Sequence, residues 1–486
     1  MSGDIEALAR GVILTGWSPD APEYAGCVLF ARDGESVAEV RARTDALRAR
    51  SELTPLIAID QEGGRVARLR RDVESIPSMM ALGAVGDERL AFRSGEAIAH
   101  DLKRAGVTID FAPVLDLAVD SRNTVIGTRA FGSDPELVSR LGLAFARGLR
   151  SGGIVPVYKH FPGHGSTDRD SHLELPRVAA SAEAFRANDL EPFARLARDA
   201  EAVMSAHVVV DAFDPKNPAS LSSAIMRHLL RDELGFEGVA FSDCLQMNAV
   251  ASLGAAEAVV SALAAGTDCA IVSHDLELAE ACARRLVDAT RRGELPLARL
   301  QEAHDRVRRL RQAGAPPSDM RTPAPYPGIG REIACRAVTL VRGSAAARAR
   351  ESVVVSFEGE SYDGVGGDRA SAVMQAPGLE SLRASLNPEG PEVTHILDRL
   401  AASGRRPIVL ARSAHLHPGQ VGAIDAIVQR QDDAIVISTR EPFDIPCFER
   451  AKHVLATYGD EAVSLDAAAE VLFDGVAASG TLPVHW

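Results

Sequence analysis

Paired cysteines, long apolar runs and an excess of positive charge are all missing from this sequence of 486 residues. None of its six cysteines belongs to a C-x-x-C pair, the spacing expected of a zinc site or a redox dithiol. We therefore expect reduced, mostly buried thiols of the kind found in cytosolic proteins. The sequence predicts no metal and no other cofactor.

Segments that would direct the chain to or across a membrane are also missing. The first six residues, Met1 to Glu6, contain neither the basic region nor the unbroken apolar region of a signal peptide. No uncharged apolar run reaches the roughly 18 residues that a membrane-spanning helix needs. We therefore expect a cytoplasmic, soluble protein with no membrane partner.

The balance of charge is acidic, with 53 Lys and Arg residues against 67 Asp and Glu residues and a formal charge of −14. A nucleic-acid-binding surface would be a local exception to this field, so we expect no nucleic-acid partner. The 46% of hydrophobic and 25% of charged residues are ordinary for globular proteins. At about 100–200 residues per domain, the length fits two or three domains, or one large barrel with a second domain.

Short β-branched apolar runs recur through the first 275 residues and are separated by longer stretches with helical periodicity. Eight such runs are candidate strands: 11–14, 27–30, 56–59, 107–109, 154–157, 202–204, 238–241 and 270–272. Their alternation with helical stretches favours a (β/α)₈ TIM-like barrel over an open sheet. The first two runs are too close for a crossover helix, so we expect an irregular start to the barrel.

The last third of the chain has a different organisation. A Pro/Gly-rich stretch follows the helical pattern that ends near residue 312, and it predicts a linker. Beyond it, strand-like runs at 353–356, 407–410 and 434–438 alternate with helical segments such as 392–403. We predict an α/β chain with a catalytic barrel over 1–314, a linker over 315–330 and a smaller α/β sandwich domain over 331–486.

Polar and titratable residues gather where the predicted barrel strands give way to loops. Asp60 and Asp110 follow the third and fourth runs, Lys159 and His160 follow the fifth, and His207 and Asp243 follow the next two. A single strand-end Asp is as often only a helix cap. Five strand ends with such residues are hard to explain as capping, and the loop face is where barrel enzymes carry their sites.

The segment 159–172 concentrates three His, two Asp, one Lys and one Arg in a loop that contains Gly and Pro. Asp170 and His172 are two residues apart, so the carboxylate can orient the imidazole and favour its protonated form. Such a pair can act as a general acid and then as a general base. For an Asp-His pair of this kind alone, a solvated loop without a catalytic role is the commoner explanation. A zinc site at His160, His164 and His172 is also possible, but their spacing matches no metal-site pattern.

The run 238–241 delivers Asp243 to the carboxyl end of a predicted strand. A carboxylate in this place can attack an electrophilic carbon or hold a metal ion. The residues so far leave both alternatives open.

In combination these segments resemble glycoside hydrolase family 3, and within it the β-N-acetylglucosaminidase branch associated with cell-wall recycling. The likeness spans about residues 10–310. It rests on the segments 59–66 with Arg68, 111–116, 125–132, 159–172, 217–222, 234–238 and 241–243. The segments 331–343 and 480–484 resemble the start and the end of the second domain of that family.

The resemblance implies a site and a reaction. Asp243 would be the nucleophile of a retaining exo-β-N-acetylglucosaminidase, and His172 supported by Asp170 would be the acid/base. The residues implied to bind sugar hydroxyls and the N-acetyl group are Asp60, Arg68, Arg129, Lys159 and His160, with His207 either beside them or supporting Lys159 and His160. Each of these could instead be an ion pair that only holds its loop. The implied substrates are carbohydrates containing N-acetylglucosamine, either muropeptides or chitin-like oligosaccharides.

Two positions depart from the family pattern. Cys244 stands where an Asp commonly follows the nucleophile, which changes the charge beside Asp243. Ser166 stands where an Asp is usual, and we expect this to loosen the loop. Both departures bear on substrate preference more than on reaction type.

Two other functions remain open at this point. A β-N-acetylglucosaminide phosphorylase is favoured by a His acid/base, which is neutral after proton donation and repels phosphate less than a Glu would. A non-catalytic sugar-binding protein on the same scaffold is the other alternative. For residues 331–486 we expect a structural or substrate-shaping role, or a part in forming a homodimer.

Overall fold

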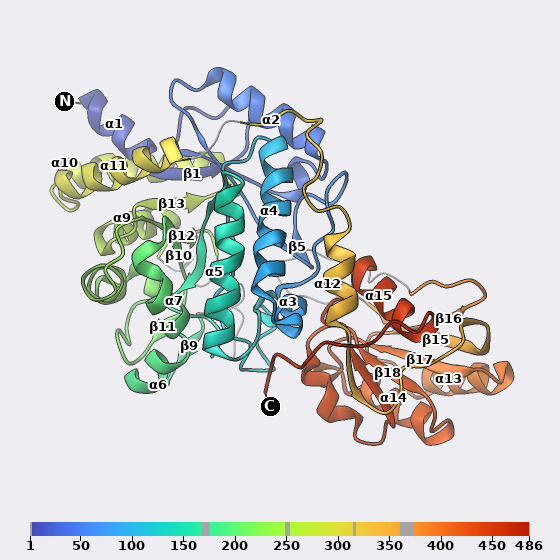
Figure 1. Cartoon of the computed structure of the whole chain (residues 1–486). Helices are drawn as coiled ribbons and strands as arrows, with labels where there is room; N and C mark the ends of the chain where they lie inside the picture. Colours follow the sequence, from blue (N-terminus) through green and yellow to red (C-terminus); the bar gives the residue numbers. More distant parts are fainter. Residues whose placement is uncertain (1, 168–174, 248–252, 314–316, 360–373, 486) are drawn as a thin grey trace.

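The chain forms two large parallel-rich sheets with helices packed around them and two small two-stranded sheets, as a computed structural model shows for residues 2–167, 175–247, 253–313, 317–359 and 374–485. In Figure 1 the first sheet and its helices run from blue to yellow, and the second sheet and its helices are orange and red. None of the helices within these ranges is long and apolar enough to cross a membrane.

Nine short strands make up the first sheet, in the order β7-β6-β3-β2-β1-β13-β12-β10-β8, with every pairing parallel. The strands are β1 (Ile13–Gly16), β2 (Gly26–Leu29), β3 (Leu56–Ile59), β6 (Ile109–Asp110), β7 (Val155–Pro156), β8 (Tyr158–Phe161), β10 (Ala202–Ser205), β12 (Val239–Cys244) and β13 (Cys269–Val272). The two end strands, β7 and β8, are separated in the chain by Val157 alone, so the ends of the sheet meet and nearly close a barrel.

This sheet confirms the barrel prediction, since all eight predicted runs overlap its strands. The fifth run is divided between β7, which pairs with β6, and β8, which pairs with β10. The irregular start is also confirmed, because β1 and β2 are parallel neighbours and residues 17–25 between them contain no helix.

The barrel interior is filled by alternate residues of the strands. Leu14, Val28, Ala58 and Val155 share one buried cluster inside the sheet, whereas Ile13 belongs to a different cluster under the outer helices. Strand side chains alternate between the two faces of a sheet, so β-branched runs buried on both faces suit a barrel covered by helices.

The outer helices of the described barrel, six of which begin at a side-chain cap, surround its sheet. They are α1 (Ser2–Arg10), α2 (Val37–Arg50), α3 (Met79–Val85), α4 (Glu88–Arg104), α5 (Pro135–Ser151), α6 (Ala182–Ala187), α7 (Glu191–Leu196), the π-helix η5 (Ala224–Glu233), α9 (Ala255–Ala265), α10 (Leu276–Arg291) and α11 (Leu297–Ala313). Before α5, Asp134 accepts a hydrogen bond from the Glu136 amide and Pro135 opens the helix. A methyl group on Gly95 of α4 would lie 2.2 Å from the carbonyl oxygen of Phe145, so the close approach of α4 and α5 requires glycine there.

The second sheet has six strands in the order β14-β19-β18-β17-β15-β16, all parallel except β14 against β19. These are β14 (Thr339–Arg342), β15 (Ser352–Glu358), β16 (Glu380–Ser385), β17 (Arg406–Ala411), β18 (Ile435–Ser438) and β19 (His453–Ala456). One face packs on α13 (Gly390–Ser403) and α14 (Pro418–Arg430), and the other on α12 (Ile329–Ala337) and α15 (Ala462–Phe473). This three-layer arrangement agrees with the predicted α/β sandwich.

Residues 317–328, within the predicted linker, lie along the barrel. The carbonyl oxygens of Ser318 and Met320 accept hydrogen bonds from Arg41 and Arg104, and the Tyr326 hydroxyl donates to Glu96. This part of the chain is therefore fixed to α2 and α4. Where the domains begin and end stays a prediction.

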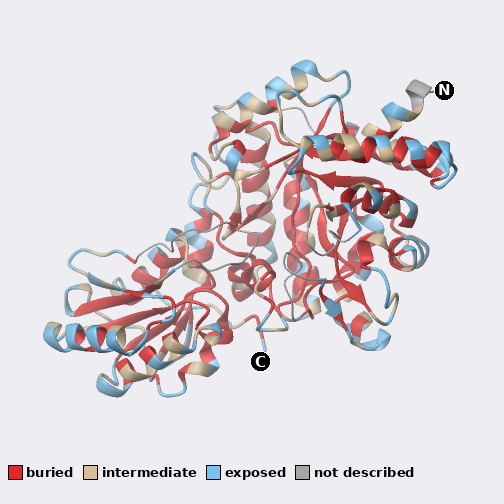
Figure 2. Cartoon of the chain, turned by 180° about the vertical axis from the view of Figure 1, so that it is seen from behind, coloured by how far each residue is buried: buried red, intermediate tan, exposed pale blue. Residues whose placement is uncertain are grey.

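The two units share one apolar core. Met80 and Ala84 of α3 and Ile126 of the barrel belong to the same buried cluster as Val355 and Val436 of the second sheet. The end of the chain returns to the barrel, where the Ser133 amide donates to the carbonyl oxygen of Pro483. Figure 2 shows buried residues in red along both sheets, with exposed residues on the outward faces of the helices.

Candidate active site

The carboxyl edge of the barrel collects most of the residues that the sequence singles out. Asp60 follows β3, Asp110 ends β6, and Lys159 and His160 lie in β8. Asp243 lies in β12. Because all strands of the barrel run in parallel, their carboxyl ends meet on one face, which is where barrel enzymes hold their sites.

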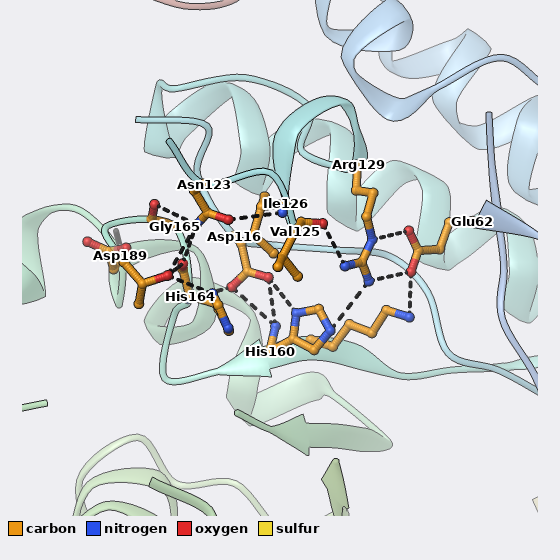
Figure 3. A network of polar contacts seen from close by, with 12 residues as sticks. Glu62, Asp116, Asn123, Val125, Ile126, Arg129, His160, His164, Gly165 and Asp189 are labelled. Carbon is orange, nitrogen blue, oxygen red and sulfur yellow. Dashed lines mark hydrogen bonds and ion pairs between the residues drawn. The ribbon is translucent and has the colours of Figure 1, made fainter. Parts of the chain in front are cut away.

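A network of buried charges joins five of the predicted residues, Asp60, Arg68, Arg129, Lys159 and His160. The Lys159 ammonium lies 2.8 Å from Asp60 Oδ1 and 2.6 Å from Glu62 Oε1. Arg129 donates two hydrogen bonds of 2.8 Å to the Glu62 carboxylate, and its Nη2 lies 3.4 Å from His160 Nε2. Arg68 donates to Asp60 Oδ2 at 3.2 Å. Figure 3 shows the half of this network around Arg129, Glu62 and His160.

Burial and charge act in opposite directions on the pKa values of this network. Burial alone would lower the pKa of Lys159, but Asp60 and Glu62 outweigh it and raise that pKa above its usual value. Burial would raise the pKa of Glu62, but Arg129 and Lys159 hold it at about 2. The same opposing effects lower the pKa of Asp60, where Lys159 and Arg68 act. All these groups are therefore charged at neutral pH.

Two carboxylates of the site were missing from the sequence-based prediction. Glu62 is 1% exposed between Lys159 and Arg129, and Asp116 is fully buried with Oδ2 at 2.6 Å from His160 Nδ1. Buried cations need carboxylate partners, and Asp60 alone cannot neutralise two. That count of charges is the signal that could have identified Glu62.

His160 is held between an acceptor and a donor. Its Nδ1 faces Asp116 Oδ2, and its Nε2 faces a guanidinium N–H of Arg129. Since an arginine can only donate, this arrangement fits a neutral imidazole with its proton on Nδ1. The peptide bond between Lys159 and His160 is cis.

Three buried polar atoms at this edge have no hydrogen-bond partner among the described residues. They are Asp110 Oδ2, His164 Nε2 and Ser205 Oγ. Burial raises the pKa of Asp110 well above its usual value, and burial lowers the pKa of His164 to about 4 against the charges of Asp116 and Asp243. Buried polar atoms of this kind are normally completed by ordered water or by a ligand.

Asp243 is half-buried, and its Oδ1 accepts a hydrogen bond of 2.7 Å from the Cys244 amide. Burial raises the pKa of the Cys244 thiol, so the residue after Asp243 is uncharged at neutral pH. His207 bonds to the Ser220 hydroxyl at 2.7 Å and to the carbonyl oxygen of Cys244 at 3.0 Å. His207 therefore contacts the backbone of the segment that carries Asp243.

Ser166 holds its loop in place, whereas the sequence led us to expect that a serine here would loosen the loop. Its amide and its hydroxyl both donate to the Asp189 carboxylate, at 2.9 and 2.5 Å. An Asp at this position would instead meet a second carboxylate. Asp170 and His172 lie outside the described residues.

Comparison with known proteins gives a consistent picture. Residues 21–310 match the family described as Glycosyl hydrolase family 3 N terminal domain. A beta-hexosaminidase of Pseudomonas aeruginosa is 44% identical over 271 residues, which is 54% of this chain and 80% of the relative.

Two solved structures extend the likeness to the whole chain. A glycoside hydrolase family 3 β-N-acetylglucosaminidase from Paenibacillus sp. str. FPU-7 has a TM-score of 0.91 at 31% identity, over 99% of this chain and 98% of that one. A β-glucoside phosphorylase has a TM-score of 0.83 over 99% of this chain and 93% of that one, and at 21% identity it shares the fold alone. By its sequence and its fold, the chain belongs to glycoside hydrolase family 3 and is a glycoside hydrolase.

Proposed function

We propose that this glycoside hydrolase is a retaining, exo-acting β-N-acetylglucosaminidase that removes terminal N-acetylglucosamine from muropeptides or short chitin-like oligomers. The names of the Pseudomonas and Paenibacillus relatives support the choice of sugar. The observation that carries the proposal is the charged network at the barrel edge, on the same edge as Asp243. A non-catalytic sugar-binding role does not fit a member of this enzyme family.

The network suits a sugar because its donors and acceptors are fixed in place and can still form further hydrogen bonds. Lys159 has three N–H groups and uses two of them on Asp60 and Glu62, which leaves one for a hydroxyl. The Asp60 side chain is 19% exposed and its carboxylate oxygens can each accept a further bond. Bonds between hydroxyls and charged groups are stronger than bonds between neutral groups.

The exposed fraction of their side chains divides the predicted binding residues into two groups. The side chains of Asp60 and Arg68 are 19% and 12% exposed, whereas those of Lys159 and Arg129 are 2% and 3% exposed. We therefore assign direct contact with sugar hydroxyls first to Asp60 and Arg68. Lys159 and Arg129 lie behind them and reach the sugar with their remaining N–H groups, and His160, whose proton is used on Asp116, lies beside Arg129.

In the proposed reaction His172 and Asp243 act on opposite sides of the anomeric centre. His172, oriented by Asp170, gives its proton to the glycosidic oxygen while the Asp243 carboxylate attacks the anomeric carbon, and the bond to the leaving group breaks. A water molecule then attacks the glycosyl ester and passes its proton to His172. N-Acetylglucosamine leaves with its original anomeric configuration, and the Asp243 carboxylate is restored.

Hydrolysis of an aryl β-N-acetylglucosaminide, followed by proton NMR with and without inorganic phosphate, tests the proposal. We expect free N-acetylglucosamine to appear first as the β-anomer in both conditions. The α-anomer as first product would contradict retention. N-Acetylglucosamine 1-phosphate would make the enzyme a phosphorylase.

The acid/base role of His172 has a separate signature. Replacing His172 with Ala should slow substrates with basic leaving groups far more than substrates with activated aryl leaving groups, because protonation matters most for a poor leaving group. Rates across a series of aryl β-N-acetylglucosaminides measure this dependence. Equal losses across the series would count against the role.

A further inference from the structure

The carboxyl edge of the second sheet lies against the barrel loop that leads to Arg129. After β17, His415 of the short helix η7 (Ala414–Leu416) places its Nε2 2.8 Å from the carbonyl oxygen of Ser121. After β18, Glu441 contacts Gly127, and after β19 the carbonyl oxygen of Tyr458 accepts a bond from Ser78. Strand ends of the second sheet therefore meet the loop face of the barrel.

Glu441 is a member of this edge that packs on the turn before Arg129. A methyl group on Gly127 would lie 2.5 Å from Glu441 Oε1, so the carboxylate packs directly on the glycine. Its Oε2 accepts a hydrogen bond of 3.0 Å from Ser413, and Arg440 Nη2 lies 3.7 Å from Oε1. Burial would raise the pKa of Glu441, but Arg440 and Arg65 hold it at about 2, so the group is charged at neutral pH.

The turn itself is held from its other side by Arg65. Nη2 of Arg65 donates to three consecutive carbonyl oxygens, those of residues 124–126, at 2.7, 2.9 and 3.2 Å. The short helix η2 (Gly127–Arg129) follows at once, opened by Gly127 with φ of 43°. Arg65 is also one of the charges that act on Glu441. The turn thus lies between a cation of the barrel and an anion of the second sheet.

This turn determines where the Arg129 guanidinium lies. The amide of Arg129 donates to the carbonyl oxygen of Ile126 at 2.9 Å, and its Nη1 donates to that of Val125 at 3.1 Å. The same guanidinium makes the two bonds to Glu62 and faces His160. A displacement of the turn would therefore change how Arg129 meets both of its partners in the site.

We propose that Glu441 is a positioning residue for the binding site, which fixes the turn at residues 124–127 and through it the Arg129 guanidinium. The second unit would then complete the site without supplying a group that touches the sugar. The inference rests on the proposed function for the identity of the ligand. The placement of the turn can be measured without any ligand.

The test compares Glu441→Gln with Glu392→Gln in the full chain. Glu392, in the first turn of α13, is a matched control, because it also accepts a bond from a serine hydroxyl. Its partner is Ser385, the last residue of β16, the strand at the edge of the second sheet. We expect E441Q to speed amide hydrogen exchange in peptides covering residues 121–131. KM for an aryl β-N-acetylglucosaminide should rise about tenfold, the factor set by the free energy of roughly one hydrogen bond, with a much smaller change in kcat. E392Q should change neither quantity.

A double-mutant cycle with Arg129→Lys separates positioning from general destabilisation. If Glu441 acts through Arg129, E441Q should have little further effect on KM in the R129K background. An undiminished effect in that background would overturn the proposal, as would wild-type exchange and wild-type KM in E441Q itself. If E441Q folds poorly, Ser413→Ala takes its place. This variant removes the serine hydroxyl that donates to Glu441 but keeps the charge of Glu441, and we expect a smaller change of the same kind in exchange rate and KM.

Failure of the proposed function is distinguishable from failure of this inference. If the wild-type chain cleaves no N-acetylglucosaminide, the function proposal fails. The exchange rates of residues 121–131 then decide the inference alone, with faster exchange in E441Q supporting it and unchanged exchange refuting it.

Discussion

The two sheets both carry buried charges at their carboxyl ends, but these charges meet different partners. At the barrel edge, Asp60, Glu62, Lys159 and Arg129 bond to one another, and the network reaches solvent through Asp60 and Arg68. At the edge of the second sheet, polar groups also pair with one another, as His415 does with Asp444, but His415 and Glu441 in addition bond to or pack against the backbone of the barrel. Polar residues at strand ends therefore indicate a binding site only where they bond to one another and include side chains that are exposed to solvent.

Loss of the proposed nucleophile should give the largest difference between the two edges. Asp243→Asn should lower kcat on an aryl β-N-acetylglucosaminide by about 10⁴-fold or more, the scale seen when one member of a covalent catalytic unit is removed. Asp45→Asn, at an exposed carboxylate of α2, is the control for loss of one charge. Turnover of D243N near the wild-type rate would contradict the account.

Removal of the second unit should test whether the barrel edge is complete by itself. A chain that ends at Ala313 uncovers Met80 and Ile126, which are fully buried in the shared core. Exposing two such side chains costs about 3–6 kcal/mol. We expect an insoluble or strongly destabilised barrel, measured by its yield and its thermal unfolding midpoint. A soluble barrel with wild-type activity would make residues 331–486 dispensable.

Loss of a buried cation should be costlier at the barrel edge than loss of an exposed one in the second unit. Lys159→Met leaves Asp60 and Glu62 short of a partner and should lower the free energy of unfolding by about 3–5 kcal/mol. Lys452→Met, which breaks the exposed pair with Asp432, should cost less than about 1 kcal/mol. Urea unfolding measures both, and equal losses would remove the distinction between the two regions.

The smallest expected effect is a pH dependence of the contact between the units. Both ring nitrogens of His415 face acceptors, Asp444 and the carbonyl oxygen of Ser121, so both bonds need the protonated ring. Burial would lower the pKa of His415, but its hydrogen bond to Asp444 and the charge of Asp444 raise it above the usual value. The stabilisation is therefore present below the unfolded pKa of about 6.5 and is lost as the pH rises through the folded pKa.

His415→Gln measures that dependence. The variant should lose about 1 kcal/mol of unfolding free energy relative to the wild type at pH 6, and much less at pH 9. Urea unfolding at both pH values is the measurement. A difference that does not change with pH would show that His415 makes no charge-dependent contact.

Much of the barrel edge could be predicted from the sequence, because its signals are local. β-Branched runs mark the strands, and the residues that follow a run fall on the carboxyl edge, where both Asp60 and Asp243 lie. Glu62 and Asp116 lie inside the segments 59–66 and 111–116, but their contacts depend on the burial of Lys159 and His160, which no local pattern reveals.

The contacts between the second unit and the barrel could not be predicted in this way. The bond between Ser78 and Tyr458 joins residues 380 positions apart, and that between Ser121 and His415 joins residues 294 apart. Such contacts depend on how two folded units pack. The sequence of 413–415 or 439–441 alone resembles an ordinary loop.

Covalent trapping tests the central claim, that the barrel edge carries the reacting carboxylate, most directly. A 5-fluoro N-acetylglucosaminyl fluoride would transfer its sugar to the nucleophile and leave it there long enough for peptide mass spectrometry. We predict a single glycosyl adduct on Asp243 that is absent in Asp243→Asn. An adduct on another residue, or turnover of the reagent with no adduct on Asp243, would contradict the account.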